Sequence, residues 1–228
     1  RLRAELVAGH LLVVEGKANA LSHQSHRGDL RRLGRDIADS LRDAWSQCAR
    51  VQRYLTSAST VTFESERADR SFSVEAAVER VLFVNPMLHT LGVFAFELPR
   101  LQSLVEFESP GVPWPALITD LRVITELAGP AELLHYLQWR SQLPLGDGMH
   151  AVDELDIFGS YLFGGGGGPS PEPELLVNLA SSTTTFDSYY FAVEAGENPD
   201  PPRRDLGDWL EAVLDDLAET RPRRWLDQ

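Results

Sequence analysis

The stretch LLVVEGKANAL, residues 11–21, decides the fold class that we expect for this chain. Its first four residues are apolar, which predicts a central β-strand buried on both faces. The preceding run, RLRAELVA, meets this strand at Ala8-Gly9, a turn signal, so the two runs predict an antiparallel hairpin. The same stretch carries Lys17, which is the only lysine among the 21 Lys and Arg residues of the chain.

The segment after the hairpin has a helical pattern. Apolar residues recur every three or four positions from about Arg27 to Leu55, with Arg and Asp on the opposite side, and this spacing predicts one long amphipathic helix. Gly28 and Gly34 weaken its first turns. The stretch NALSHQSH, between the strand and the helix, is polar and predicts a loop.

The rest of the sequence predicts strands followed by helices. TVTFES and SFSVEAA alternate around ERADR and predict a second hairpin, and VERVLFVN predicts another strand that Asn85-Pro86 ends. GVPWPALITDL predicts a proline-rich connector, after which Thr119 or Asp120 would cap a helix. Further amphipathic helices are predicted over AELLHYLQWRSQL, AVDELDIFGSYLF and DLGDWLEAVLDDLAE.

These patterns predict an α/β (α+β) fold in two parts. Residues 1–110 would form an α/β core with a mixed central sheet and a long helix. Residues 111–228 would form a mostly helical region with a Gly/Pro-rich loop at 164–174, where GGGGGPSPEPE is of low complexity.

Composition bounds the class of protein. The chain is 43% hydrophobic and 24% charged, as in ordinary globular proteins. No apolar run approaches the roughly 20 residues that span a bilayer, and no signal-peptide pattern opens the chain, so we expect no membrane partner. One cysteine, Cys48, excludes an intrachain disulfide and suits the cytoplasm, the localisation we expect. Because Arg1 opens the chain within a predicted strand, we also expect a piece of a longer protein.

The charge is unevenly distributed. The net charge of −13 argues against indiscriminate binding of nucleic acid, because phosphate contacts need cations. Residues 1–54, however, carry ten Lys and Arg against six Asp and Glu, whereas residues 55–228 carry eleven against twenty-eight. DNA or RNA would therefore bind through residues 1–54. The alternative is that these cations form a solvated helix face.

Glu15 and Lys17 are two positions apart at the end of a predicted strand, so their side chains emerge on one face. This pair suits metal-assisted hydrolysis of phosphodiesters: a carboxylate holds Mg²⁺, and an ammonium orients water or neutralises charge in the transition state. Lysine is a compact charge that can lose its proton, unlike arginine, which gives a reason for one lysine to persist. The alternative is an exposed ion pair, worth about 0–1 kcal/mol.

Together with the helical segment DAWSQCARVQRYL, the stretch LLVVEGKANALS resembles the restriction-endonuclease-like PD-(D/E)XK superfamily, especially its nuclease-related (NERD-like) members. Later segments resemble regions that follow this core in large uncharacterised bacterial proteins. The resemblance implies an αβββαβ core, here truncated at its N-terminus, in which E-x-K lies on the second strand of a hairpin. It implies that Glu15 is the metal-binding acid, Lys17 the motif lysine and Gln47 the helix glutamine. The cofactor would be Mg²⁺ or Mn²⁺.

The superfamily also places an aspartate on the preceding strand, opposite the glutamate of E-x-K. Counting across a turn centred on Gly9 puts Arg3 opposite Glu15, and Glu5 is the only carboxylate of the first strand. Three alternatives follow: Glu5 is the second metal ligand, an acid comes from a preceding segment, or the site is degenerate. The expected function is thus a Mg²⁺-dependent nuclease or, alternatively, an inactive nuclease-like fold that binds nucleic acid or protein. The oligomeric state is left open.

Overall fold

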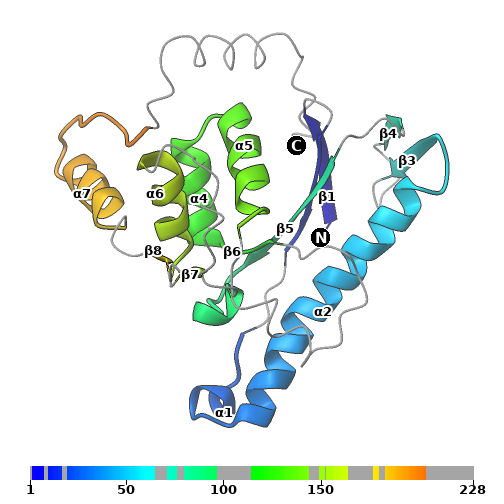
Figure 1. Cartoon of the computed structure of the whole chain (residues 1–228), viewed down its shortest axis with the longest axis horizontal. Coiled ribbons are helices and arrows are strands. Elements are labelled where there is room, and N and C mark those ends of the chain that lie inside the picture. The colour runs from blue at the N-terminus through cyan, green and yellow to red at the C-terminus, as the bar shows by residue number, and fades with distance from the viewer. Residues whose placement is uncertain are drawn as a thin grey trace. The chain divides into compact units, whose positions relative to one another are not determined.

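The computed structural model describes residues 2–7, 10–16, 20–64, 71–75, 80–96, 114–143, 149–151, 153–163, 177–179 and 183–203. Over these residues the chain has the mixed α+β fold that its sequence predicts (Figure 1). It divides into two compact units, 1–89 with 104–115 and 90–103 with 116–228. The predicted domain boundary after residue 110, the Gly/Pro-rich loop at 164–174 and the helix over DLGDWLEAVLDDLAE lie outside the described residues.

The first unit contains a mixed sheet. β1 (Leu2–Val7) and β2 (His10–Glu15) form the predicted antiparallel hairpin, and β5 (Arg80–Met87) pairs with β2 in parallel. The strand order is β1-β2-β5-β6, with β6 over Trp114–Leu117, of which Trp114 and Pro115 belong to this unit. β2 is therefore an interior strand, as predicted, but it is fully buried on one face only, because its side chains alternate between buried and half-buried.

The long predicted helix is interrupted near its start. α2 spans Leu30–Leu55, and it begins there because the carboxylate of Asp29 accepts hydrogen bonds from two backbone N–H groups of its first turn. Gly28 has a φ of +88°, which separates α2 from the short helix α1 (His23–His26). Part of the polar stretch that we expected to be a loop is thus helical.

The apolar stripe of α2 packs against the sheet. The second predicted hairpin consists of β3 (Thr60–Glu64) and β4 (Ser71–Glu75), and it also packs against α2. Figure 1 shows α2 running from α1 at one end to this hairpin at the other. The buried residues of the shared cluster come from β2, α2, β3 and β4. They are Leu11, Val13, Val51, Val61 and Val74. Burial of this cluster fixes which face of β2 lies under the helix.

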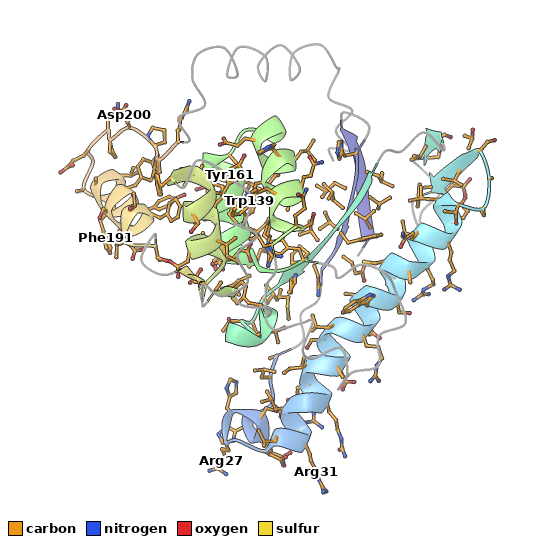
Figure 2. All side chains as sticks on the ribbon, in the orientation of Figure 1. Arg27, Arg31, Trp139, Tyr161, Phe191 and Asp200 are labelled. Atoms are coloured by element: carbon orange, nitrogen blue, oxygen red, sulfur yellow. The ribbon has the colours of Figure 1, made fainter. Side chains whose placement is uncertain are left out.

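The second unit is mostly helical, and Figure 1 shows α4, α5 and α6 side by side. Its core is aromatic: the rings of Trp139 and Tyr161 lie 5.5 Å apart between α5 and α6 (Figure 2). Its elements in chain order are η1 (Gly92–Ala95), α4 (Ile118–Leu127), α5 (Pro130–Arg140), β7 (Met149–Ala151), α6 (Glu154–Phe163), β8 (Val177–Leu179) and α7 (Thr183–Glu194). The pairing of β7 with β8 is parallel.

Three local predictions were wrong. Asn85-Pro86 does not end its strand, because β5 continues to Met87. The proline-rich connector contains β6, whose Pro115 is part of the strand. Thr119 and Asp120 do not cap α4, since the helix begins after Leu117 without a side-chain cap and both residues lie in its first turn. Of the helices that the structure describes, none is long and apolar enough to cross a membrane.

Candidate functional site

Glu15 is the last residue of β2 and is buried, with 7% of its side chain exposed. It follows Leu11 and Val13 on the buried side of the strand, which is the side that packs in the cluster with α2. An exposed surface ion pair, the alternative raised for the E-x-K motif, therefore does not describe this glutamate. Lys17 lies outside the described residues, and its role stays a prediction.

The first strand pairs with β2 one residue away from the predicted register. Leu2 pairs with Glu15, and Arg3 pairs with Val14. Glu5 pairs with Leu12, three positions from the end of the strand. Because successive positions of a strand alternate between the two faces, position 5 belongs to the face opposite that of position 15. The register thus does not bring Glu5 to Glu15.

Gln47 is half-buried on α2, one turn before Val51 of the apolar cluster. α2 lies between two parallel strands, β2 and β5, in the order of the chain, so it must return in the direction opposite to theirs. A residue one turn earlier in α2 than Val51 therefore lies toward the carboxyl end of β2. Glu15 stands at that end.

Asn85 of β5 is the residue that sequence reasoning missed. Its side chain is completely buried, and neither Oδ1 nor Nδ2 has a hydrogen-bond partner. An unsatisfied buried amide costs about 1–3 kcal/mol in protein mutational data. A fold that keeps such a group directly after the apolar run Val81–Val84 has a place for a polar partner beside it.

The strand register places Asn85 beside Glu15. The recorded parallel pairing of β2 and β5 ends with Val14 and Val84, and the next residue of each strand is Glu15 and Asn85. Glu15 lies two positions beyond Val13 of the apolar cluster, and Asn85 lies two positions beyond Phe83, which packs against that cluster, so both continue the same face. Neighbouring strands are about 4.8 Å apart, so these residues stand at one level on adjacent strands. The only sequence signal was a polar residue directly after an apolar run, and together with Pro86 it predicted the end of the strand.

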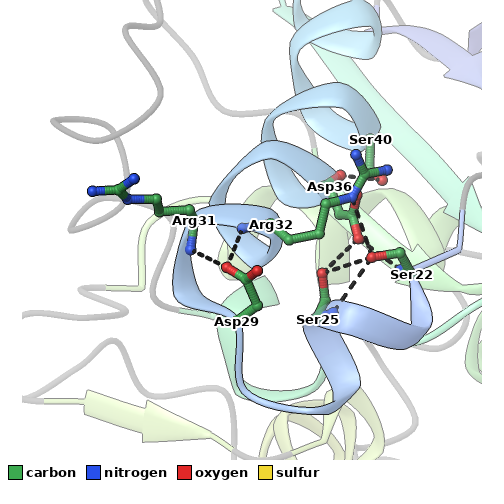
Figure 3. A network of polar contacts seen from close by, with 7 residues as sticks. All are labelled: Ser22, Ser25, Asp29, Arg31, Arg32, Asp36 and Ser40. Carbon is green, nitrogen blue, oxygen red and sulfur yellow. Dashed lines mark hydrogen bonds and ion pairs between the residues drawn. The ribbon is translucent and has the colours of Figure 1, made fainter.

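A network of polar contacts fixes the chain between β2 and α2 (Figure 3). The backbone N–H of Ser22 and the hydroxyl of Ser25 each donate to Oδ2 of Asp36, at 2.6 Å. Nε of Arg32 lies 2.9 Å from Oδ1 of the same carboxylate. The hydroxyl of Ser40 donates to the backbone carbonyl of Asp36 at 2.8 Å. The segment that follows Glu15 is thereby tied to the first turns of α2.

The network also sets the charge of Asp36. Burial alone raises the pKa of this carboxyl, but the hydrogen bonds from Ser22 and Ser25 and the charge of Arg32 outweigh it and lower the pKa to about 2. Both carboxylate oxygens are engaged, so Asp36 acts as a structural anion rather than as a candidate ligand. Sequence reasoning placed the aspartates of this helix on its solvent side, which is wrong for Asp36 because it is 5% exposed.

The polar side chains at the carboxyl ends of β2 and β5 carry the type of ligand atom, oxygen, that a hard divalent cation prefers. Mg²⁺ is bound through one or two carboxylates and other oxygen atoms, and it keeps several waters. Glu15 offers a carboxylate and Asn85 an amide oxygen, whereas neither offers the sulfur or imidazole that zinc prefers. No group of three His, Cys, Asp or Glu residues that could hold a metal ion occurs in the described part of the chain.

Arginines form an exposed stripe on α2. Arg31, Arg35, Arg42 and Arg53 recur at multiples of the helical repeat and are all exposed. Figure 2 shows Arg27 and Arg31 extending outward where α1 meets α2. The predicted contact of nucleic acid with residues 1–54 would use this surface.

The second unit has a buried polar group of its own. Arg140 donates from Nε and Nη2 to the two carboxylate oxygens of Glu154, at 2.5 and 2.8 Å, and the hydroxyl of Tyr136 donates to Oε1. Burial and the charge of Glu154 raise the pKa of Tyr136 well above its ordinary value. These three residues join α5 to the start of α6. Because the charges of Arg140 and Glu154 balance, we interpret them as a structural ion pair.

Comparison of the chain with protein-family models, curated proteins and solved structures finds no match.

Proposed function

We propose that the first unit is a nuclease-like domain that hydrolyses phosphodiesters of nucleic acid with Mg²⁺ or Mn²⁺. The observation that carries the proposal is the burial of Glu15 at the carboxyl end of an interior strand. A carboxylate at this place is an oxygen donor of the kind that Mg²⁺ binds in proteins. The order of hairpin, long helix and parallel strand is the order that the resemblance to the PD-(D/E)XK superfamily implies, apart from the hairpin β3–β4 that lies between α2 and β5 in this chain.

Each residue has a definite role in this proposal. A bound Mg²⁺ ion would supply an activated water and stabilise charge on the phosphate. Glu15 holds the cation, and Lys17 orients the attacking water or neutralises the negative charge of the transition state. Gln47 orients groups from the helix side, where it is half-buried. The exposed arginines of α2 attract the phosphate backbone.

The test is cleavage of labelled DNA and RNA by the full chain with Mg²⁺ or Mn²⁺. We expect fragments that disappear when EDTA is added, and we expect Glu15→Gln and Lys17→Ala each to abolish them. Glu64→Gln is a matched control, because Glu64 is an exposed strand carboxylate away from β2. Cleavage that survives both Glu15→Gln and Lys17→Ala would reject the assignment.

A second candidate function follows from the register of β1. Leu2 stands opposite Glu15, where the superfamily has an aspartate, so the site lacks an acid from this strand. The alternative is therefore an inactive nuclease-like fold that binds nucleic acid. It predicts binding without cleavage even when Mg²⁺ or Mn²⁺ is present, with an affinity that falls as salt rises.

This alternative has its own measurement. Fluorescence anisotropy with a labelled duplex would give the slope of affinity against salt concentration. Replacing Arg31, Arg35 and Arg42 with Gln should lower that slope by roughly 0.7–0.9 for each phosphate contact removed. Arg122→Gln on α4, in the second unit, is the control. An unchanged slope in the triple variant would exclude the arginine stripe as the binding surface.

A further inference from the structure

We propose that Asn85 is the second protein ligand of the Glu15 site: its amide oxygen binds the divalent cation together with the carboxylate of Glu15. This inference rests on the proposed metal site but names a residue that the E-x-K motif does not contain. Three observations carry it. They are the strand register, the burial of both residues and the unsatisfied amide of Asn85.

The register supplies the proximity. β2 and β5 are parallel, so their carboxyl ends meet at the same edge of the sheet, where ligands of α/β proteins commonly bind. Glu15 and Asn85 are each one residue beyond the last recorded pair. On β1, the other neighbour of β2, the partner position is Leu2. The register therefore places a polar residue level with Glu15 on β5, whereas the partner position on β1 holds a leucine.

The chemistry of the amide fits the role. An asparagine carbonyl is a neutral oxygen donor, which hard cations accept alongside a carboxylate. Asn85 is completely buried and its Oδ1 has no hydrogen-bond partner, so the oxygen is available without breaking an existing contact. A neutral ligand in place of a second carboxylate leaves the site with one formal negative charge. We therefore expect weaker cation binding than a site with two acids gives.

The experiment measures Mn²⁺ binding to the full chain by calorimetry, with Mn²⁺ alone as the probe. Asn85→Leu should weaken binding by at least about tenfold, because it removes a ligand. Asn85→Asp should strengthen binding by at least about tenfold, because it adds a second carboxylate to the site. Asn198→Asp is the matched control: it is the same substitution in the same Asn-Pro sequence, at an exposed position.

A stability measurement keeps the inference testable if Asn85→Asp folds poorly. Two carboxylates on adjacent strands repel each other without a cation, so the melting temperature of this variant should fall in EDTA and recover in Mn²⁺. The rise caused by Mn²⁺ should be larger than in the wild type. Equal rises in the two proteins would overturn the inference.

The outcomes separate this inference from the proposed function. If Glu15→Gln abolishes Mn²⁺ binding but Asn85→Leu leaves it unchanged, Asn85 is not a ligand, while the metal site stands. If both variants lose Mn²⁺ and yet the wild type cleaves neither DNA nor RNA, Asn85 is a ligand and hydrolysis is rejected. If the wild type binds no Mn²⁺, both proposals fail.

Discussion

Leu2 and Glu15 are partners across the β1–β2 hairpin, at the position where the resemblance to the PD-(D/E)XK superfamily predicts two acids on neighbouring strands. Val7 pairs with His10, so two residues of the chain separate the last paired positions of the hairpin. Such a short connection fixes the register, and a shift by one residue would move every β1 side chain to the other face of the sheet.

This register predicts the effect of supplying the missing acid. In the full chain, Leu2→Asp should raise the affinity for Mn²⁺ by at least about tenfold, because partner positions of antiparallel strands lie on one face and a second carboxylate increases the charge of the site. Calorimetry measures this affinity directly. Arg3→Asp is the control, since position 3 pairs with Val14 on the other face. Equal gains from the two substitutions would contradict the register argument.

The Asp36 network predicts a stability that depends on pH. The pKa of Asp36 is lowered from 3.8 to about 2, so the folded protein favours the charged carboxylate. The stabilisation is therefore complete above about pH 4 and is lost as the pH falls toward 2. Asp36→Asn should cost about 1–3 kcal/mol in the free energy of unfolding at pH 7, because it leaves hydrogen-bond donors without an anion. The difference from wild type should shrink between pH 4 and pH 2.

Urea unfolding of the two proteins across this pH range is the measurement. Asp29→Asn makes the same chemical change at the N-cap of α2, where asparagine caps as well as aspartate, so its free energy of unfolding should stay close to that of the wild type. If the free energy of unfolding lost by Asp36→Asn did not vary with pH, the network would stabilise the fold through its geometry and not through the charge of Asp36.

The sequence predicts the two hairpins and α2 well because each is a local pattern. Alternation and a turn signal suffice for a hairpin, and the apolar stripe suffices for the helix. Pro115 misled the prediction of β6, since proline usually breaks a strand. Within the described sheet, however, β6 is last in the strand order, and edge strands tolerate proline.

The site was harder to predict because its partners come from distant segments. The sequence around Asn85 does not indicate that β5 pairs with β2, nor that this pairing ends level with Glu15. Asp36 lies at the border of the apolar stripe, and it is buried because Ser22 and Ser25 reach it from the preceding segment. Long-range pairing thus decided which polar residues are inside, and a periodic pattern does not contain that information.

The buried ion pair of the second unit predicts a non-additive response. Arg140→Met should cost about 3–5 kcal/mol in the free energy of unfolding, because it leaves the carboxylate of Glu154 buried without its cation. Replacing both residues, with Arg140→Met and Glu154→Leu, should recover most of this loss. Chemical unfolding of the two single variants and the double variant gives the coupling energy.

The control for this cycle is an ion pair at the surface. Arg122 and Glu126 lie on successive turns of α4, with side chains 78% and 42% exposed, and Arg122→Met should change stability little. If the double variant of the buried pair were as unstable as Arg140→Met alone, the loss would come from lost packing of the arginine stem and not from the unpaired charge.

The raised pKa of Asp120 predicts a second dependence of stability on pH, opposite in direction to that of Asp36. Burial, followed by the negative charges of Asp153 and Glu154, raises its pKa from 3.8 to about 6, although a hydrogen bond from Thr119 works against them. The folded protein therefore favours the protonated carboxyl. This contribution to stability is complete below about pH 4 and is lost as the pH rises through 6.

Asp120→Asn mimics the protonated carboxyl, so it should melt at a higher temperature than the wild type at pH 7 and at nearly the same temperature below pH 4. Asp153→Asn should lower the pKa of Asp120, because it removes the neighbouring charge with the largest effect. Carboxyl carbon shifts in NMR report that titration directly. Asp200→Asn, at an exposed position outside this group, controls for the loss of a charge as such. If Asp120 titrates near pH 4 in the folded wild type, burial does not raise its pKa. The expected gain in melting temperature of Asp120→Asn at pH 7 would then be absent.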